Sequence, residues 1–382
     1  MDILFILFCI VSGAIFIYSF KSQLSENNYK VLWYLLIYHL IFGVYFYYFA
    51  YGDSITYWKE AKVLNYDNFL NSIINGQGTA FMNALNYYPA NVLNLSYFSG
   101  TIMFTFIGFV GLTYFYVNAV KLIPNNPKFL GINLFPLLFF LPNLHFWSCG
   151  VGKDTIIFTC IAFVMHGLLK PLKRLPLLIL ALTLTFFVRP HITLFLLLAF
   201  GIAYFSGKNI SFFKRILFFS VLIGIAIIIL PIVLKFTKIE EASLSSFDKF
   251  SMSKAAVLSR ATSSSSVNIT AYPFPLKVFT FLFRPYFLDV NSIPSLLAAI
   301  ENFILLILTI SIFRHKPIAT FKSAPFIIQG IIYFLIIGTL AFSQSLGNLG
   351  IMIRMRNMFL PGFIIFIFWH FSFQTIKETE LK

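Results

Sequence analysis

The chain has 382 residues, of which 59% are hydrophobic, 19% aromatic and only 11% charged. Soluble domains carry about 25% charged residues, so this composition excludes an ordinary soluble enzyme and indicates a polytopic membrane protein. The formal net charge of +15 does not indicate a nucleic-acid-binding protein, because most of it lies in loops between apolar runs, where it sets membrane orientation.

Apolar runs that could cross the hydrocarbon core of a bilayer recur along the whole chain, and we expect about eleven transmembrane helices. They cover residues 2–20, 31–50, 101–120, 130–146, 155–169, 175–188, 192–207, 216–234, 293–312, 324–342 and 358–373. The alternating pattern of a transmembrane barrel is absent from the sequence. The predicted fold is therefore an all-α, polytopic membrane helical bundle that forms a single membrane domain over residues 1–382.

The orientation follows from the basic residues of the loops. With the N-terminus outside and the C-terminus cytoplasmic, the inner loops hold most of the net positive charge, as the positive-inside rule requires. Two long extracytoplasmic segments result, residues 51–100 and residues 235–290, and the second contains a Ser-rich stretch at 243–266. We expect the function to reside in the membrane body and in these two segments.

The first polar motif, residues 52–58, directly follows the second apolar run. Asp53 offers a carboxylate for general base catalysis or metal binding, and the flat rings of Tyr57 and Trp58 suit sugar rings. The alternative is structural: Asp53 caps an interfacial helix over residues 54–64, where aromatic side chains are common. The two roles are compatible.

The second motif is a glycine-containing turn, residues 147–155, that opens into a predicted helix. Backbone N–H groups at a helix N-terminus, with Lys153 beside them, can bind an anion. The turn is not a P-loop, because Trp147 and Asp154 stand where that motif needs Gly and Ser or Thr. Alternatively, it is a tight turn between spans in which Asp154 caps the helix and pairs with Lys153.

Arg189 and Arg284 each precede a proline. Because proline disfavours helix at the residue before it, we expect both arginines in extended bends at the membrane surface. A guanidinium placed there can bind phosphate through two parallel hydrogen bonds, or it can reach toward lipid headgroups. His191 adds a titratable group beside Arg189, as a base or as a hydrogen-bonded structural residue.

The third motif, residues 347–357, leads into the last apolar run and contains Arg354 and Arg356. These two side chains point the same way only if the segment is extended or re-entrant, which its two glycines permit. Glu301 lies inside the ninth apolar run, where a carboxylate is costly unless it is paired. We therefore expect an ion pair between Glu301 and one of these arginines.

Basic loop residues normally stay on the cytoplasmic side, yet a set of them is predicted at the outer ends of spans. This set consists of Lys153, Arg189, Arg284, Arg354 and Arg356. The sequence predicts a shared outer cavity lined by these groups, which implies a substrate with concentrated negative charge. In a membrane, such a substrate is a lipid-linked phosphate or pyrophosphate.

These motifs together resemble bacterial polytopic proteins of polysaccharide clusters, namely the O-antigen or exopolysaccharide repeat-unit polymerases and related GT-C-type glycosyltransferases. The likeness spans most of the chain. It rests on Asp53 in the first outer loop, the Phe-Trp-Ser-x-Gly-x-x-Lys-Asp turn at 146–154, the Arg-Pro-His at Arg189, the Phe-Arg-Pro at Arg284 followed by Glu301-Asn302, and the Asn348-Leu349-Gly350 before Arg354 and Arg356.

The resemblance implies a GT-C-like fold in the bacterial inner membrane and a sugar donor carried on a polyprenyl phosphate or pyrophosphate. It also implies membrane lipid and polysaccharide-assembly proteins as partners. The family's phosphate-clamping arginines would correspond to Arg189, Arg284, Arg354 and Arg356, and its acidic loop residue to Asp53. This loop has no Asp-x-Asp or Asp-Glu pair, so the need for a divalent metal is left open and no cofactor is assigned.

We therefore expect a membrane glycosyltransferase that polymerises lipid-linked oligosaccharide units at the extracytoplasmic face. Asp53, or alternatively His191, would deprotonate the acceptor hydroxyl, while the arginines stabilise the departing phosphate. Sugar rings would stack on Tyr57, Trp58, Tyr87 and Tyr88. Two alternatives are a flippase or transporter of a lipid-linked or anionic substrate, and a structural membrane protein.

Overall fold

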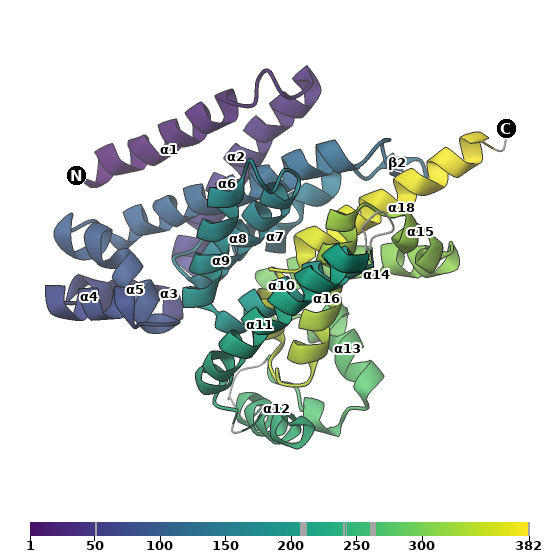
Figure 1. Ribbon diagram of the computed structural model, residues 1–382. Coiled ribbons are helices and arrows are strands. Elements are labelled where there is room, and N and C mark those ends of the chain that lie inside the picture. The colour runs from purple at the N-terminus through teal and green to yellow at the C-terminus, as the bar shows by residue number, and fades with distance from the viewer. Residues whose placement is uncertain (50–51, 207–211, 240, 242, 260–264, 381–382) are drawn as a thin grey trace. The chain divides into compact units, whose positions relative to one another are not determined.

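The computed structural model describes the whole chain except residues 50–51, 207–211, 240, 242, 260–264 and 381–382 (Figure 1). The described residues are mostly helical, with almost no strands, which confirms the predicted all-α class. Within them, the strands are confined to a small hairpin of β1 (Lys128–Phe129) and β2 (Ile132–Asn133). Residues 51, 240, 242 and 260–264, which belong to the predicted outer segments and the Ser-rich stretch, lie outside the described residues.

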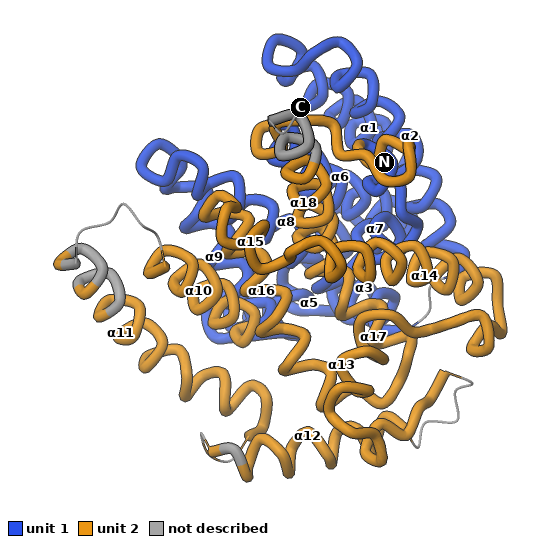
Figure 2. Tube along the Cα trace, turned by 90° about the vertical axis from the view of Figure 1, so that its right-hand side faces the viewer, with its two compact units in different colours: residues 1–120, 136–189 blue, residues 121–135, 190–382 orange. Residues whose placement is uncertain are grey.

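The chain divides into two compact units (Figure 2). Unit 1 comprises residues 1–120 and 136–189, and unit 2 comprises residues 121–135 and 190–382. The expectation of a single membrane domain stays a prediction.

Unit 1 is built around α6, whose aromatic residues Phe104, Phe109 and Phe115 are fully buried. A Cβ on Gly111 of α6 would lie 2.8 Å from the backbone of Thr159, so this glycine allows α6 and α8 to approach closely. The helices of unit 1 are α1 (Asp2–Tyr18), α2 (Glu26–Phe49), α3 (Asp53–Lys62), α4 (Tyr66–Ile74), α5 (Thr79–Tyr87), η1 (Tyr88–Val92), α6 (Tyr97–Leu122), η2 (Leu137–Phe140), α7 (Pro142–Phe146), α8 (Lys153–Leu168) and α9 (Leu175–Val188).

The short helices α3, α4, α5 and η1 form the first predicted outer segment, and they are tied to the longer helices of unit 1. The Ser54 hydroxyl of α3 lies 2.7 Å from the Tyr97 hydroxyl of α6. The N–H of Gly78, just before α5, donates to the carbonyl of Phe187 in α9 over 2.8 Å. These contacts fix α3 and α5 next to the ends of α6 and α9.

Unit 2 is organised around α16, which packs against α10, α13 and α18. Gly330 of α16 lies under the ring of Phe200 in α10, and Gly338 lies under the ring of Phe359. The helices of unit 2 are α10 (Pro190–Phe205), α11 (Phe212–Thr237), α12 (Leu244–Ser259), η3 (Ile269–Ala271), α13 (Phe274–Phe283), η4 (Phe287–Asp289), α14 (Ile293–Arg314), α15 (Pro317–Ser323), α16 (Phe326–Ser343), α17 (Leu349–Arg356) and α18 (Leu360–Glu380).

Fewer helices than expected are long enough to cross a bilayer. Within the described part of the chain, five helices are long and apolar enough to cross a membrane: α2, α6, residues 220–237 of α11, α14 and α16. The pair α17 and α18, bent by 61°, would add a sixth, while α1, α9, α10 and α13 are shorter apolar helices. These helices fit a multi-pass membrane protein, but the expected eleven spans are not confirmed.

One predicted span, residues 130–146, does not form a continuous helix. It contains the end of the hairpin, the 3-10 helix η2 and the short helix α7. Gly131 adopts a positive φ of 80° in the hairpin turn, and Pro136 and Pro142 each prevent a helix from continuing through them. The segment is apolar, as predicted, but residues that favour turns prevent one continuous helix.

Gly108 of α6 supplies a test of this packing. A Cβ there would lie 1.7 Å from the backbone oxygen of Ser148. Gly108→Ala should therefore displace the backbone and lower the free energy of unfolding by about 1–3 kcal/mol. Gly224→Ala in α11 is the matched control, because no atom lies within 4 Å of its Cβ position. Thermal unfolding of the purified protein in detergent measures both. Equal stability of the two variants would contradict the packing of α6 against residue 148.

Candidate functional site

Asp53 is the first residue of α3, and its side chain is exposed. The helix expected over residues 54–64 is therefore present, with Gly52 in the N-cap position and Asp53 in the first turn. A carboxylate in the first turn is stabilised by the partial positive charge of the helix N-terminus. Tyr57 follows one turn later, on the same side of α3 as Asp53.

Lys153 is the first residue of α8, and the predicted helix after the glycine-containing turn is confirmed. Its ammonium nitrogen lies 5.4 Å from the centre of the Tyr57 ring, in a cation–π contact, and 3.0 Å from the hydroxyl oxygen of Thr79. Tyr57 of α3 and the first residues of α5 and α8 thus meet around one ammonium group. Residues from three distant segments of the sequence come together in unit 1.

Arg189, the residue after α9, has an extended backbone conformation with φ −150° and ψ 88°, as its position before a proline predicts. Its Nη2 atom lies 2.7 Å from Oδ1 of Asp154 in α8. Only 5% of Arg189 and 9% of Asp154 is exposed. The positive charge of Arg189 is therefore balanced by a carboxylate inside unit 1, which joins α8 to α9.

The aromatic residues predicted to hold sugar rings differ in exposure. Tyr57, Trp58 and Tyr87 are buried, whereas 54% of Tyr88 is exposed. Trp58 packs on the backbone of Gly100 in α6, and Tyr87 stacks on Phe69 of α4 with ring centres 4.5 Å apart. Trp58 and Tyr87 thus serve the packing of unit 1, Tyr57 contacts Lys153, and Tyr88 is the one of the four that is open to solvent.

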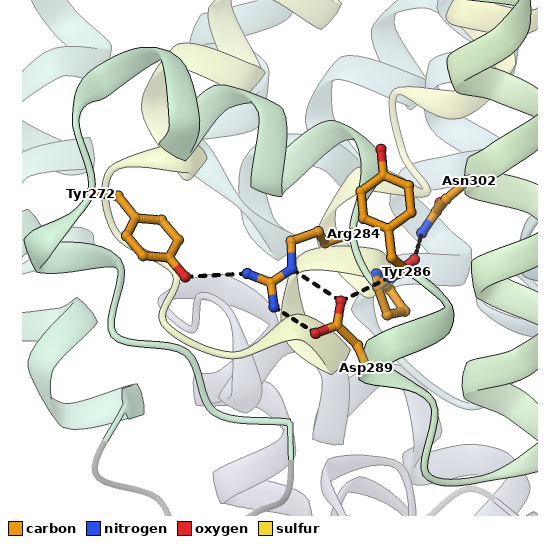
Figure 3. A network of polar contacts seen from close by, with 6 residues as sticks. Tyr272, Arg284, Tyr286, Asp289 and Asn302 are labelled. Carbon is orange, nitrogen blue, oxygen red and sulfur yellow. Dashed lines mark hydrogen bonds and ion pairs between the residues drawn. The ribbon is translucent and has the colours of Figure 1, made fainter.

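In unit 2, Arg284 forms a two-point contact with Asp289 (Figure 3). Its Nε and Nη2 atoms donate to the two carboxylate oxygens over 3.0 and 2.5 Å, and its Nη1 atom donates to the Tyr272 hydroxyl over 3.3 Å. The backbone of Arg284 is extended, as predicted from Pro285. The geometry expected for phosphate is thus used within the chain, by a carboxylate five residues away.

Arg356 is buried at the end of α17, and Asn302 of α14 connects it to the same network. The amide oxygen of Asn302 accepts from Nη2 of Arg356. The amide nitrogen of Asn302 donates to the carbonyl of Pro285 over 2.9 Å (Figure 3). Arg356 also donates to the carbonyl of Leu282. Glu301, which is 1% exposed, precedes Asn302 in α14, and its predicted ion pair with one of the two arginines stays a prediction.

Arg354 and Arg356 were expected to align in an extended or re-entrant segment; the segment is helical and not extended, and the 61° bend between α17 and α18 is compatible with a re-entrant loop. Residues 349–356 form the helix α17, in which positions two apart point to nearly opposite sides. Arg356 is buried, while Arg354 is partly exposed. The side chain of Asn348 accepts a hydrogen bond from the N–H of Ile351 and so caps α17.

His191 is the second residue of α10, in apolar surroundings. Its ring centre lies 6.0 Å from that of Phe195, 5.9 Å from that of Phe236 and 6.0 Å from that of Phe342. It lines a largely apolar cavity of about 270 Å³ in unit 2. The two predicted candidate bases therefore lie in different units and in different environments, with Asp53 exposed to water and His191 among aromatic rings.

Sequence reasoning missed two residues that decide how the arginines are used. Asp289 pairs with Arg284, and its spacing of five residues across a proline gives no helical or strand signal. Asn302 of α14 connects Pro285, just after α13, to Arg356 of α17, and its position beside Glu301 is the one sequence signal for it. In the described ranges, no three His, Cys, Asp or Glu side chains lie close enough together to hold a metal ion.

Comparison of the chain with protein-family models, with curated proteins and with solved structures finds no match.

The Asp154–Arg189 contact predicts a specific mutational pattern. Arg189→Leu removes the cation that pairs with the buried carboxylate of Asp154 and should lower the free energy of unfolding by about 3–5 kcal/mol. The double variant Asp154→Leu/Arg189→Leu should recover most of this loss, because apolar side chains can replace a buried ion pair at little cost. Thermal unfolding in detergent measures the pattern, and a single variant as stable as the parent protein would contradict it.

The Arg284–Asp289 contact predicts a dependence of stability on pH. Hydrogen bonding to Arg284 lowers the pKa of Asp289 below its ordinary value of 3.8, despite partial burial. A lowered carboxyl pKa stabilises the fold fully above the unfolded value, about pH 4, and this contribution is lost as pH falls through the folded value.

Asp289→Asn should therefore lower stability by about 1–2 kcal/mol at neutral pH and flatten part of the acid-side decline. Unfolding curves of both proteins between about pH 2.5 and 7 test this, over the window that the lowered pKa defines. Parallel curves for the parent and Asp289→Asn would show that the contact does not contribute.

Proposed function

We propose that the chain is an integral-membrane glycosyltransferase that uses a sugar donor carried on a polyprenyl phosphate or pyrophosphate. The reaction takes place at the extracytoplasmic face of a bacterial inner membrane, and the product is a polymer of lipid-linked oligosaccharide units. The apolar spanning helices support a membrane setting. The sugar chemistry rests on the resemblance of the motifs and on the groups gathered in unit 1.

The observation that carries the proposal is the meeting of α3, α5 and α8. An exposed carboxylate, Asp53, lies one helical turn from Tyr57, and Lys153 stands over the Tyr57 ring. A carboxylate accessible to water can accept a proton, and an ammonium group nearby can neutralise an anion. Both groups belong to the first predicted outer segment or contact it, so they would meet a donor on the same side of the membrane.

In the proposed reaction, Asp53 accepts the proton of an acceptor sugar hydroxyl as its oxygen attacks the anomeric carbon of the donor. The new bond joins the acceptor oxygen to that carbon, and the bond from the carbon to the phosphate oxygen breaks. The bonding electrons leave on the polyprenyl phosphate, where Lys153 stabilises the added negative charge. The exposed ring of Tyr88 offers a flat surface for a sugar.

The arginines have a different role in this proposal from the one the sequence suggested. Arg189 is held by Asp154, and Arg284 by Asp289, so their charges are already partly balanced. Arg189 therefore positions the start of α8, and with it Lys153, while Arg284 and Arg356 order unit 2.

A second candidate is a flippase or transporter of a lipid-linked or anionic substrate. The observation that favours it is the bend of 61° between α17 and α18, with the buried Arg356 at the break. Broken helices with polar groups near the break are common in transporters. In reconstituted vesicles a transporter moves the lipid-linked donor across the bilayer and leaves its glycosidic bonds unchanged, whereas a transferase releases polyprenyl phosphate.

Asp53→Asn is the decisive variant, because it removes the proton acceptor and keeps the side-chain shape. In a strain that lacks the gene, this variant should restore at most about 1% of polymer, a loss of about 100-fold or more. Asp67→Asn is the matched control, since Asp67 is an exposed acid in the first turn of α4 in the same segment. Glycolipid analysis by mass spectrometry measures the product.

Single repeat units should accumulate in the deleted strain and with Asp53→Asn, while Asp67→Asn should give normal polymer. Repeat units short of one sugar would indicate a single-sugar transferase, and units trapped on the cytoplasmic leaflet a flippase. Normal polymer from Asp53→Asn, with equal protein in the membrane, would remove the proposed mechanism.

A further inference from the structure

Two neighbouring cavities in unit 2 differ sharply in chemistry and share part of their walls. The first has a volume of about 270 Å³ and the second about 320 Å³. Both are lined by α12 and by the end of α11, and they share Thr237, Ile239, Phe250 and Lys254. A ligand that fills both must be apolar at one end and polar at the other.

The first cavity, the apolar cavity, lies between α10, α11, α12 and α16. Leucine, valine and phenylalanine side chains form most of its wall, among them Leu230, Val233, Phe195, Phe247 and Phe342. His191 and Glu241 also line it. A wall of this kind gains free energy by covering hydrocarbon, because apolar surface is removed from water on both sides.

The second cavity, the lysine cavity, is lined by Lys238, Lys249 and Lys254 and by the hydroxyl-bearing residues Thr237, Ser246 and Ser253. The three lysines are exposed, and Glu241 lines the adjoining apolar cavity. Lysines and hydroxyl groups are the usual donors to phosphate oxygens.

Lys238 adopts a backbone conformation that is unfavourable for a lysine. Lys238 follows α11 with a positive φ of 62°, a conformation in which glycine is the usual residue at a helix end. On α12, Phe247, Phe250 and Lys254 follow the spacing i, i+3 and i+7, so one stripe of the helix carries both apolar wall and charge. The amphipathic wall is thus built into the sequence of α12.

The apolar cavity lies at the C-terminal ends of two helices that are long enough to span a membrane. Its wall includes Leu230, Val233, Leu234 and Thr237 of α11 and Ala341 and Phe342 at the end of α16. At the end of a span, hydrocarbon lies on one side and headgroups and water lie on the other. A lipid would therefore meet the apolar cavity with its chain and the lysine cavity with its headgroup.

From these observations we infer that unit 2 binds one lipid phosphate, with its isoprenoid or alkyl chain in the apolar cavity and its phosphomonoester in the lysine cavity. The inference does not depend on the sugar transfer proposed above, although a polyprenyl phosphate is also the leaving group of that reaction. A phosphomonoester carries more negative charge than the phosphodiester of an ordinary phospholipid. Three lysines therefore favour it over bulk lipid.

The test uses the purified full-length protein and a short-chain prenyl monophosphate that carries a diazirine for photo-crosslinking. Crosslinks should map to α10, α11, α12 or α16, and the unlabelled monophosphate should compete for them. Lys249→Gln/Lys254→Gln should weaken binding at least tenfold, and Ala341→Phe, which fills the apolar cavity, should do so too. Lys235→Gln is the matched control, because Lys235 lies in the last turn of α11 and lines neither cavity.

Three outcomes would overturn the inference: crosslinks elsewhere in the chain, equal binding of the prenyl alcohol without phosphate, or equal competition by phosphatidylglycerol. The map of crosslinks on the parent protein decides the matter even if a variant fails to fold. Binding of the monophosphate by a protein that transfers no sugar would remove the proposed function and leave this lipid site standing.

Discussion

Each buried cation of this chain must find its counter-charge or its hydrogen-bond acceptors within the chain, because water and lipid cannot supply them in an apolar interior. Arg189 meets this constraint through Asp154 and so joins α8 to α9. Arg356 meets it through Asn302 and the carbonyl of Leu282, which joins α17 to α14 and to the end of α13. The helix ends that carry the candidate residues are held by these contacts.

The same constraint separates the basic residues by function. A guanidinium whose charge is balanced internally orders the protein around it, as Arg284 does with Asp289. Ammonium groups at helix ends and on exposed faces, such as Lys153 at the start of α8 and Lys249 on α12, are better placed to meet an anionic ligand. In the proposed reaction and in the proposed lipid site, the lysines therefore contact phosphate and the arginines hold the scaffold.

Sequence patterns predicted where helices lie but not how their side chains pair. Ten of the eleven predicted apolar runs are helical, and the extended bends at Arg189 and Arg284 follow from the prolines after them. The pairing of Arg284 with Asp289 depends on how the chain folds back after Pro285, which no periodicity records. Residues 130–146 are not one continuous helix, because turn residues interrupt the apolar run, and residues 349–356 are helical and not extended, because Asn348 caps α17.

The outer position of residues 51–100 is the claim on which the proposed reaction depends, and cysteine labelling in intact cells tests it most directly. Lys59→Cys on α3 and Lys173→Cys between α8 and α9 are both exposed, and Cys9, Cys149 and Cys160 are buried, so background labelling should be low. We predict that a membrane-impermeant thiol reagent labels the cysteine at 59 in intact cells and the one at 173 only after permeabilisation. The reverse order would place Asp53 and Lys153 on the cytoplasmic side and contradict the account.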